Sequence, residues 1–278
     1  MLVLRPPRHR HPRDYGAETL AALVADHPDP LMLAQIRLLA WRTLTFYPDH
    51  APRLWEYPIV ARLIGDALAP GGRVVDVGAG VNPLAPFLSS QGLTVDTVDP
   101  SPIRRSWPPT PDWNEWDFLD YPAAGLAHRS WNCPLHELPG WPLFDGVYSV
   151  SVIEHLRAVD RRALLGDMAL RLRPGGIAVL TVDLVRGGDD LWNRNRGEVV
   201  ESGAGHGTLS AIVAEAAGVG LDLVRLETVR EWGDVSVDIG LLVLRRSSTG
   251  GLGFPARRVS ATVRSTWNSN VRSRAGGQ

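Results

Sequence analysis

A glycine-rich turn and two aspartates are the residues of this chain whose spacing most clearly suggests chemistry. Asp76, Gly78 and Gly80 occur together in Asp76-Val77-Gly78-Ala79-Gly80, directly after a short run of β-branched residues. Glycines at such a point permit a tight turn and close backbone approach to a ligand, and the amide groups of a following helix would face it. Asp99 ends the next apolar run, 19 residues after Gly80. A carboxylate there can accept hydrogen bonds from a ribose, so these residues predict a nucleoside-binding site.

Pro83 and the charge of Asp76 indicate which nucleoside would bind. A dinucleotide-binding turn, Gly-x-Gly-x-x-Gly, requires a third glycine at position 83, where this chain has proline. Asp76 would repel a pyrophosphate and attract an ammonium group. S-adenosylmethionine has a ribose, an ammonium group and a sulfonium, and it carries no phosphate. We therefore expect S-adenosylmethionine as the cofactor, with a nucleotide-dependent dehydrogenase as the disfavoured alternative.

Glu154 and His155 follow another apolar run, at the point where a strand should end. Ligands of open α/β sheets bind beyond the carboxyl ends of strands. Since an imidazole titrates near neutral pH, His155 is the candidate catalytic base for an acceptor that carries a proton. The alternative is that both side chains pack or cap at the start of a helix. Adjacent Glu and His residues make a poor metal site, and we expect no metal.

The elements that would position these residues alternate between strands and helices. Helical spacing of apolar residues occurs at 17–25, 30–47, 56–69, 160–176 and 209–218. Strand-like runs occur at 73–80, 93–100, 144–150, 176–183, 221–229 and 237–246. The alternation predicts βαβ units and a parallel sheet that is buried on both faces.

Four of these segments resemble the motifs of the class I, Rossmann-like S-adenosylmethionine-dependent methyltransferases. Residues 74–80 (VVDVGAG) resemble the first motif, and residues 97–101 (TVDPS) the acidic end of the second strand. Residues 144–156 and 172–183 resemble the motifs of the fourth and fifth strands. The resemblance spans about residues 57–245. It implies an α/β fold with a doubly wound, mostly parallel seven-stranded sheet, helices on both faces and, in this chain, a helical N-terminal extension.

The resemblance also adds expectations about the cofactor site. The family often has a glycine where this chain has Asn82, and asparagine tolerates the left-handed backbone that such a loop requires. The acid that binds adenine after the third strand of the family has no clear counterpart here. Residues 130–140 (SWNCPLHELPG) occupy that place, with Asn132, Cys133 and Glu137 as candidates, and Cys133 is counted among the expected cofactor-binding residues.

Composition restricts the class of protein. The chain has 278 residues, 44% of them hydrophobic, and no apolar run approaches the ~20 residues of a membrane-spanning helix. A single cysteine excludes an internal disulfide. All 29 basic residues are arginine, with four in residues 1–13 and seven in residues 245–278, so the remaining body is acidic. An acidic body makes nucleic-acid binding unlikely, and we expect a cytoplasmic protein.

We expect three parts along the chain: a basic head with a helical extension at 1–55, the cofactor-binding domain at 56–246, and an Arg-rich, disordered tail at 247–278. Two irregular segments of the domain are long enough to roof the site and are expected to enclose the acceptor. Residues 101–142 contain Trp107, Trp113, Trp116, Trp131 and Trp141, and residues 184–206 are polar and glycine-rich. The tryptophans have an alternative role as a hydrophobic cover over the sheet.

The expected function is transfer of a methyl group from S-adenosylmethionine to an oxygen or nitrogen of a small molecule by direct displacement. In that reaction the protein aligns the reactants and the sulfonium supplies the reactivity. The alternative from another class is a non-catalytic module that binds S-adenosylmethionine. The acceptor and the oligomeric state stay open at this point.

Overall fold

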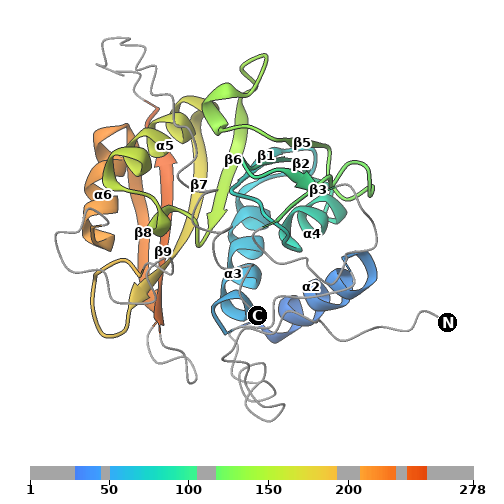
Figure 1. The fold of residues 1–278 in the computed structure, drawn as a ribbon, viewed down its shortest axis with the longest axis horizontal. Helices are drawn as coiled ribbons and strands as arrows, with labels where there is room; N and C mark the ends of the chain where they lie inside the picture. The colour runs from blue at the N-terminus through green and yellow to red at the C-terminus, as the bar shows by residue number, and fades with distance from the viewer. Residues whose placement is uncertain (1–28, 45–50, 105–116, 193–206, 230–236, 249–278) are drawn as a thin grey trace, which may run out of the picture.

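A seven-stranded sheet forms the centre of the computed structural model, which describes residues 29–44, 51–104, 117–192, 207–229 and 237–248 (Figure 1). Its strand order is β5-β2-β1-β6-β7-β9-β8. The parallel strands are β1 (Arg73–Val77), β2 (Thr94–Val98), β5 (Arg129–Trp131), β6 (Phe144–Val150) and β7 (Leu172–Val185). β9 (Val237–Arg246) pairs antiparallel with β7 and with β8 (Leu221–Val229). The expected doubly wound, mostly parallel sheet is confirmed.

The strand order reverses between β1 and β6. From β1 the chain continues outward through β2 to β5, and then returns to place β6 and β7 on the other side of β1. Val77 pairs with Val98 in register, so β1 and β2 end side by side. Ligands of open α/β sheets bind at such a reversal, beyond the carboxyl ends of the strands.

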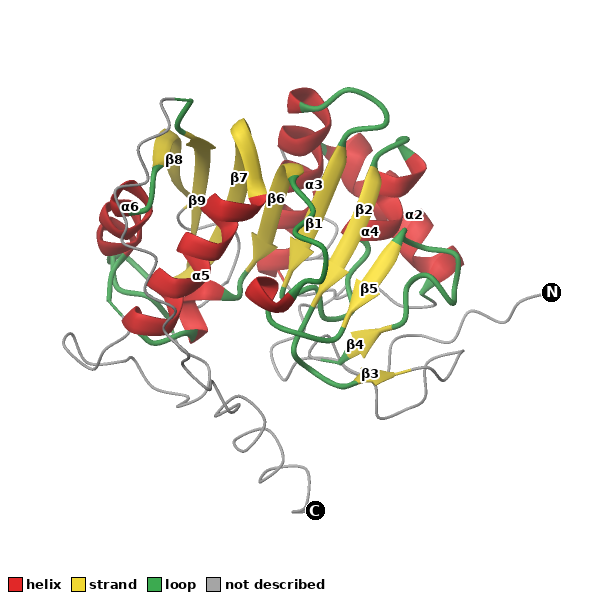
Figure 2. Cartoon of the chain, turned by 90° about the horizontal axis from the view of Figure 1, so that it is seen from above, coloured by secondary structure: helices red, strands yellow, loops and turns green. Residues whose placement is uncertain are grey.

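Two groups of helices cover the two faces of the sheet (Figure 2). One group comprises α2 (Pro30–Thr43), α3 (Ala51–Ala67) and α4 (Leu84–Ser90), which share a hydrophobic core with Tyr148 and Val179. The other comprises α5 (Ala158–Arg171) and α6 (Leu209–Gly218), whose core includes the neighbouring Val147 and Ala178. Successive side chains of a strand point to opposite faces, so the near-continuous apolar strands supply both cores.

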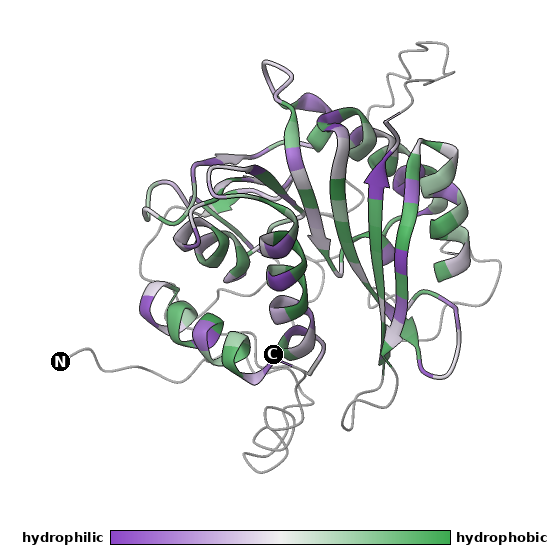
Figure 3. Ribbon diagram, turned by 180° about the vertical axis from the view of Figure 1, so that it is seen from behind, coloured by the Kyte–Doolittle hydropathy of each residue, from purple (hydrophilic) through white to green (hydrophobic). Residues whose placement is uncertain are grey.

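The hydropathy of the strands follows their place in the sheet (Figure 3). The first eight residues of β9 are buried, whereas β8 at the edge of the sheet leaves most of its residues partly or fully exposed. No helix in the described ranges combines the length and the apolar character needed to cross a bilayer.

On the α3 side of the sheet, the start of α2 agrees with the sequence-based prediction, whereas the start of α3 does not. α2 begins as expected, with the Asp29 side chain accepting from Met32 N at 3.0 Å and Pro30 in the first turn. α3 begins at Ala51, earlier than the helix expected from about residue 56, and it continues through Pro58. It therefore crosses the boundary expected between residues 55 and 56, and Leu54 and Trp55 are buried in the core on this face of the sheet.

The structure also differs from the sequence-based elements before and within β7. β7 begins at Leu172, so residues 172–176, which we expected to end a helix, are part of the strand. The stretch 101–142, expected to be irregular, contains β5 and the short parallel pair β3 (Ile103–Arg104) and β4 (Phe118–Leu119). Two short 3₁₀ turns complete the described elements: η1 (Leu135–Glu137) precedes β6, and η2 (Ile153–His155) follows it.

Only parts of the two expected roof segments are described. Trp107, Trp113 and Trp116, residues 193–206, the expected helix at 17–25 and residues 249–278 of the tail lie outside the described residues. Trp141 lies in the loop before β6, at the amino ends of the parallel strands. The prediction that Trp141 helps to enclose an acceptor is therefore wrong. Residues 184–192 extend β7 and then return beside it through a bridge between Leu184 and Leu191.

Candidate active site

The turn after β1 depends on two glycines. Gly78 and Gly80 have φ angles of 71° and 50°, in the left-handed region that favours glycine. A Cβ atom at Gly78 would lie 2.6 Å from Cγ2 of Val152, which follows β6. The turn therefore passes directly under the end of β6, and no larger residue fits at Gly78 without a shift of that segment.

Asp99 is held against this turn by backbone amides. It follows β2 and is buried, and its Oδ2 accepts from Gly80 N at 3.0 Å while Oδ1 accepts from Ser101 N at 2.7 Å. Burial raises the pKa of Asp99, and these N–H donors act in the opposite direction. A carboxylate offers about four lone-pair positions, so Asp99 can accept further hydrogen bonds from a ribose.

Asp76 lies one residue before the end of β1 and is also buried. Its Oδ2 accepts from Nδ2 of Asn82 at 3.0 Å. The pKa of Asp76 is raised to about 7, mainly by burial and to a smaller degree by the negative charge of Asp99, while the side chains of Asn82 and Tyr148 act in the opposite direction. Because a nearby positive charge favours the ionised form, a ligand with an ammonium group would return Asp76 to its carboxylate.

Asn82 closes the loop in place of the glycine that is frequent in the family. Its Nδ2 also donates to Ala79 O at 2.5 Å, and its Oδ1 accepts from Leu84 N at 2.8 Å, in the first turn of α4. Asn82 N donates to the hydroxyl of Tyr121 at 2.8 Å. Tyr121 belongs to the stretch that we expected to be irregular, and no periodicity in the sequence indicated this contact.

The turn and both acids line one cavity. Its lining also includes Arg53 and Tyr57 of α3, together with residues 150–152 at the end of β6. A glycine turn, a carboxylate placed for a ribose and a second carboxylate placed for an ammonium group fit S-adenosylmethionine. The contribution of α3 was missed in the sequence because the expected helix began at about residue 56, whereas α3 begins at Ala51 and so includes Arg53.

Cys133 is placed differently from the other expected cofactor residues. It follows β5, is partly buried and is not among the residues that line the cavity. Burial and the charge of Glu137 raise the pKa of its thiol. Asn132 beside it donates to the carbonyl oxygens of Asp99 and Ser101 and so joins the ends of β5 and β2. An adenine-binding role for Cys133 stays a prediction.

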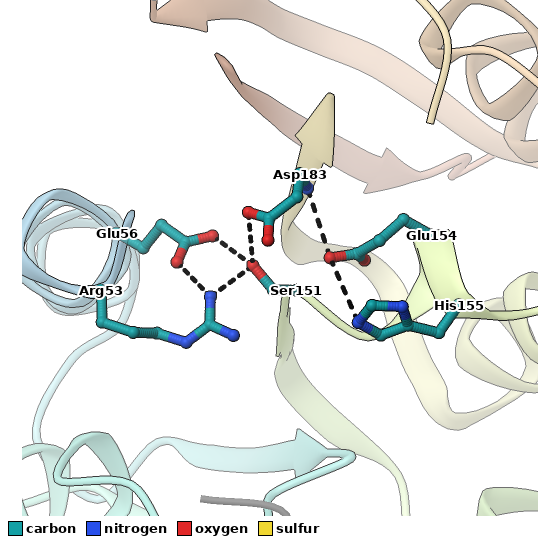
Figure 4. Close-up of polar contacts among 6 residues, drawn as sticks. All are labelled: Arg53, Glu56, Ser151, Glu154, His155 and Asp183. Atoms are coloured by element: carbon teal, nitrogen blue, oxygen red, sulfur yellow. Dashed lines mark hydrogen bonds and ion pairs between the residues drawn. The ribbon is translucent and has the colours of Figure 1, made fainter. Parts of the chain in front are cut away.

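A buried polar cluster adjoins this cavity (Figure 4). Ser151, which follows β6, has a φ of 49°, an uncommon value for a residue with a side chain. Its Oγ accepts from Nη1 of Arg53 at 2.5 Å, and it lies 2.6 Å from Oε1 of Glu56 and 3.3 Å from Oδ1 of Asp183. Arg53 Nη1 also pairs with Oε2 of Glu56 at 2.5 Å. The cluster therefore joins α3 to the ends of β6 and β7.

Glu154 and His155 lie on the other side of Ser151 from α3 (Figure 4). Oε1 of Glu154 accepts from Asp183 N at 3.2 Å and lies 3.9 Å from Nε2 of His155. Burial, and then the negative charge of Asp183, raise the pKa of Glu154 well above its ordinary value. The side chain of His155 is 4% exposed and is not part of the cavity lining. The described residues contain no group of three His, Cys, Asp or Glu that could hold a metal ion.

Comparison with known proteins agrees with this geometry. A family model described as a methyltransferase domain matches residues 47–224. Among solved structures, 1,6-didemethyltoxoflavin-N1-methyltransferase from Burkholderia thailandensis has a TM-score of 0.52 at 19% identity, covering 86% of this chain and 93% of its own. The [4+2]-cyclase SpnF has a TM-score of 0.51 at 14% identity, covering 69% and 83%. Among curated proteins, none matches this chain in sequence.

The family match spans more than half of the chain, and the structural similarities show the same fold. The fold is a class I methyltransferase architecture, and the cavity lies at the reversal of strand order between β1 and β6. The chain belongs to the S-adenosylmethionine-dependent methyltransferases, and S-adenosylmethionine is its cofactor.

Proposed function

We propose that this protein transfers the methyl group of S-adenosylmethionine to an oxygen or nitrogen of a small-molecule acceptor by direct displacement. The observation that carries the proposal is the composition of the cavity. Its lining combines the glycine turn, Asp76 and Asp99 with side chains of α3 and of the segment after β6. Arg53 and Ser151 in this lining are polar groups that can face an acceptor next to the cofactor.

Within this proposal Asp76, Asp99 and the turn from Gly78 to Asn82 hold the cofactor. When bound, the cofactor supplies an activated methyl group on a sulfonium. The chain contributes alignment, because holding two reactants in the right geometry removes much of the barrier of a bimolecular reaction. Val150 and Val152 exclude water beside the turn, and Arg53 and Ser151 offer polar contacts to the acceptor.

His155 is the proposed base for an acceptor that carries a proton. It is the last residue of η2, five residues after the end of β6, and its imidazole lies beside Glu154. Cys133 is kept as a proposed contact of the adenine end of the cofactor, since it follows β5 next to Asn132, which is bonded to the carbonyl of Asp99.

One protein of similar fold is described as a [4+2]-cyclase, so the fold alone does not establish methyl transfer. The test therefore detects the transferred methyl group directly. The protein is incubated with isotope-labelled S-adenosylmethionine and a panel of small alcohols, phenols, carboxylic acids and amines. Mass spectrometry then detects labelled products and S-adenosylhomocysteine. We expect labelled product with the wild type and, when S-adenosylmethionine is kept limiting, far less product with Asp99→Ala. Tight binding of S-adenosylmethionine without transfer to any acceptor class would favour the non-catalytic binding module instead.

A further inference from the structure

We propose that Tyr148 is a positioning residue for the cofactor. Its hydroxyl donates a hydrogen bond to the carboxylate of Asp76 and holds that carboxylate ready for the ammonium group of S-adenosylmethionine. The inference rests on the ammonium contact proposed for Asp76, and it depends neither on the identity of the acceptor nor on methyl transfer. It gives a role to a buried hydroxyl of β6 that the contacts described above leave unused.

The pairing of β1 with β6 brings Tyr148 beside Asp76. The two residues are partners in the parallel register of these strands. Val75 and Val77, on either side of Asp76, belong to the core with α5 and α6, whereas Tyr148 belongs to the core with α2, α3 and α4. Because successive side chains of a strand point to opposite faces, Asp76 and Tyr148 extend from the same face of the sheet.

The hydroxyl of Tyr148 is not engaged by any other group. The residue is fully buried, and its hydroxyl oxygen has no hydrogen-bond partner among the residues that the structure describes. Buried polar atoms are nearly always paired, so such an atom requires an explanation. The hydroxyl of Tyr121, in contrast, accepts from Asn82 N at 2.8 Å and donates to Gly80 O at 3.2 Å. Of these two phenols beside the turn, Tyr148 is the one that can act on Asp76.

The electrostatics of the pair favour Tyr148 as the donor. Burial, and then the negative charge of Asp76, raise the pKa of Tyr148 well above its ordinary value, so the phenol keeps its proton. Burial also raises the pKa of Asp76, whereas the side chains of Asn82 and Tyr148 lower it. A hydrogen bond to the charged form of an acid favours that form. Tyr148 therefore supports the ionised state of Asp76.

The ionised state matters because the pKa of Asp76 is about 7. Near neutral pH the carboxyl group is only partly charged, and its protonated form does not compensate an ammonium group. Each unit by which this pKa rises above the pH costs about tenfold in affinity for a ligand that requires the carboxylate. One hydrogen bond to a charged group can shift a pKa by about one unit. Tyr148 therefore extends cofactor binding to lower pH.

The experiment measures the binding of S-adenosylhomocysteine, which has the same ammonium group, to full-length wild type and Tyr148→Phe by calorimetry. If the pKa of Asp76 rises from about 7 to about 8, Kd should increase about tenfold at pH 6 and less than about twofold at pH 8.5. The ratio of the two Kd values at each pH cancels the titration of the ligand. It also cancels the other titratable and charged groups around Asp76, which are Asp99 after β2, Tyr121 after β4, and Arg53 and Tyr57 of α3.

Asp76→Asn provides the matched background. Because it has no carboxylate for the hydroxyl to act on, adding Tyr148→Phe to it should change Kd by less than about twofold at both pH values. An equal effect of Tyr148→Phe with and without the carboxylate would assign the hydroxyl a structural role and overturn the inference. A loss of affinity that is the same at pH 6 and pH 8.5 would do so too, as would a Tyr148→Phe protein that thermal melting shows to be unfolded.

Failure of the proposed function would be visible separately. Binding with the expected pH dependence, but no labelled product in the methyl-transfer assay, would leave the role of Tyr148 standing. Undiminished binding of S-adenosylhomocysteine by Asp76→Asn alone would place the ammonium group elsewhere. The inference about Tyr148 would then be wrong, and the proposed methyl transfer would be unaffected.

Discussion

Replacement of Asp76 by asparagine should stabilise the cofactor-free protein and weaken cofactor binding at the same time. Burial raises the pKa of this carboxyl group from 3.8 to about 7. The folded protein therefore binds a proton at Asp76 more tightly than the unfolded chain does. By linkage, the contribution of Asp76 to the free energy of unfolding is fully present below pH 3.8 and is lost as pH rises through about 7.

The magnitude follows from the two pKa values. A difference between 3.8 and about 7 corresponds to about 4 kcal/mol, which is the largest gain in the free energy of unfolding expected for Asp76→Asn at pH 8. Between pH 5 and pH 8 the gain over wild type should grow by about 3 kcal/mol. The asparagine side chain has the same shape as that of aspartate, and its amide oxygen can still accept a hydrogen bond from Asn82. Loss of a charged partner for the ammonium group should weaken S-adenosylmethionine binding roughly ten- to hundredfold.

The assay is denaturant unfolding of wild type and Asp76→Asn without cofactor at pH 5 and pH 8. The difference between the two proteins cancels the titration of all other groups, and Asp222→Asn on the exposed edge strand controls for the loss of an arbitrary carboxylate. Calorimetry with S-adenosylmethionine gives the binding arm. A stability difference that does not change with pH, or undiminished cofactor affinity, would refute this account of Asp76.

Three further replacements test the other parts of the site. Asp99→Ala should lower S-adenosylmethionine affinity about ten- to hundredfold by calorimetry, and full affinity in the folded variant would exclude the ribose contact. Gly78→Ala should reduce the free energy of unfolding by at least about 2 kcal/mol. The loss should be clearly larger than that for Gly71→Ala, because Gly71 has a similar φ of 84° but nothing within 4 Å of its Cβ position. Equal losses would show that Val152 does not restrict the turn. His155→Ala should lower turnover of an identified acceptor by roughly 10²–10⁴ with cofactor affinity intact, and wild-type turnover would show that alignment alone suffices.

Much of the fold could be predicted because its strands are buried on both faces. Runs such as residues 177–182 are apolar except for Thr181, and the glycine turn after residue 77 marks the first βα connection. The ends of elements were less predictable. Residues 172–176 contain Pro174, Gly175 and Gly176, which usually end a helix, yet here β7 begins before them and its pairing with β6 shifts register at that point. Local residue preferences cannot show such a shift, because it depends on the partner strand.

The cofactor half of the site was predictable and the acceptor half was not. Asp76 lies one residue before the end of β1 and Asp99 directly follows β2, so their meeting follows from the parallel pairing of these two recognisable strands. Ser151 meets Glu56 across 95 residues of chain, and nothing local in either segment indicates that contact. The positive φ of Ser151 is likewise set by tertiary packing after the end of β6, since serine alone does not specify a positive φ.

The acidic residues of the sheet differ in what compensates their charge, and this difference locates the ligand. Toward the amino ends of the strands, Asp96 lies 2.8 Å from the guanidinium of Arg73, and Asp145 lies 2.5 Å from that of Arg173. At the carboxyl ends, the hydrogen-bond partners of Asp76 and Asp99 are an amide side chain and backbone N–H groups, which carry no net charge. Burial consequently raises the pKa of both acids. At the amino ends of the strands, arginine side chains supply the positive charge. At the carboxyl ends, a ligand with an ammonium group and a sulfonium would supply it.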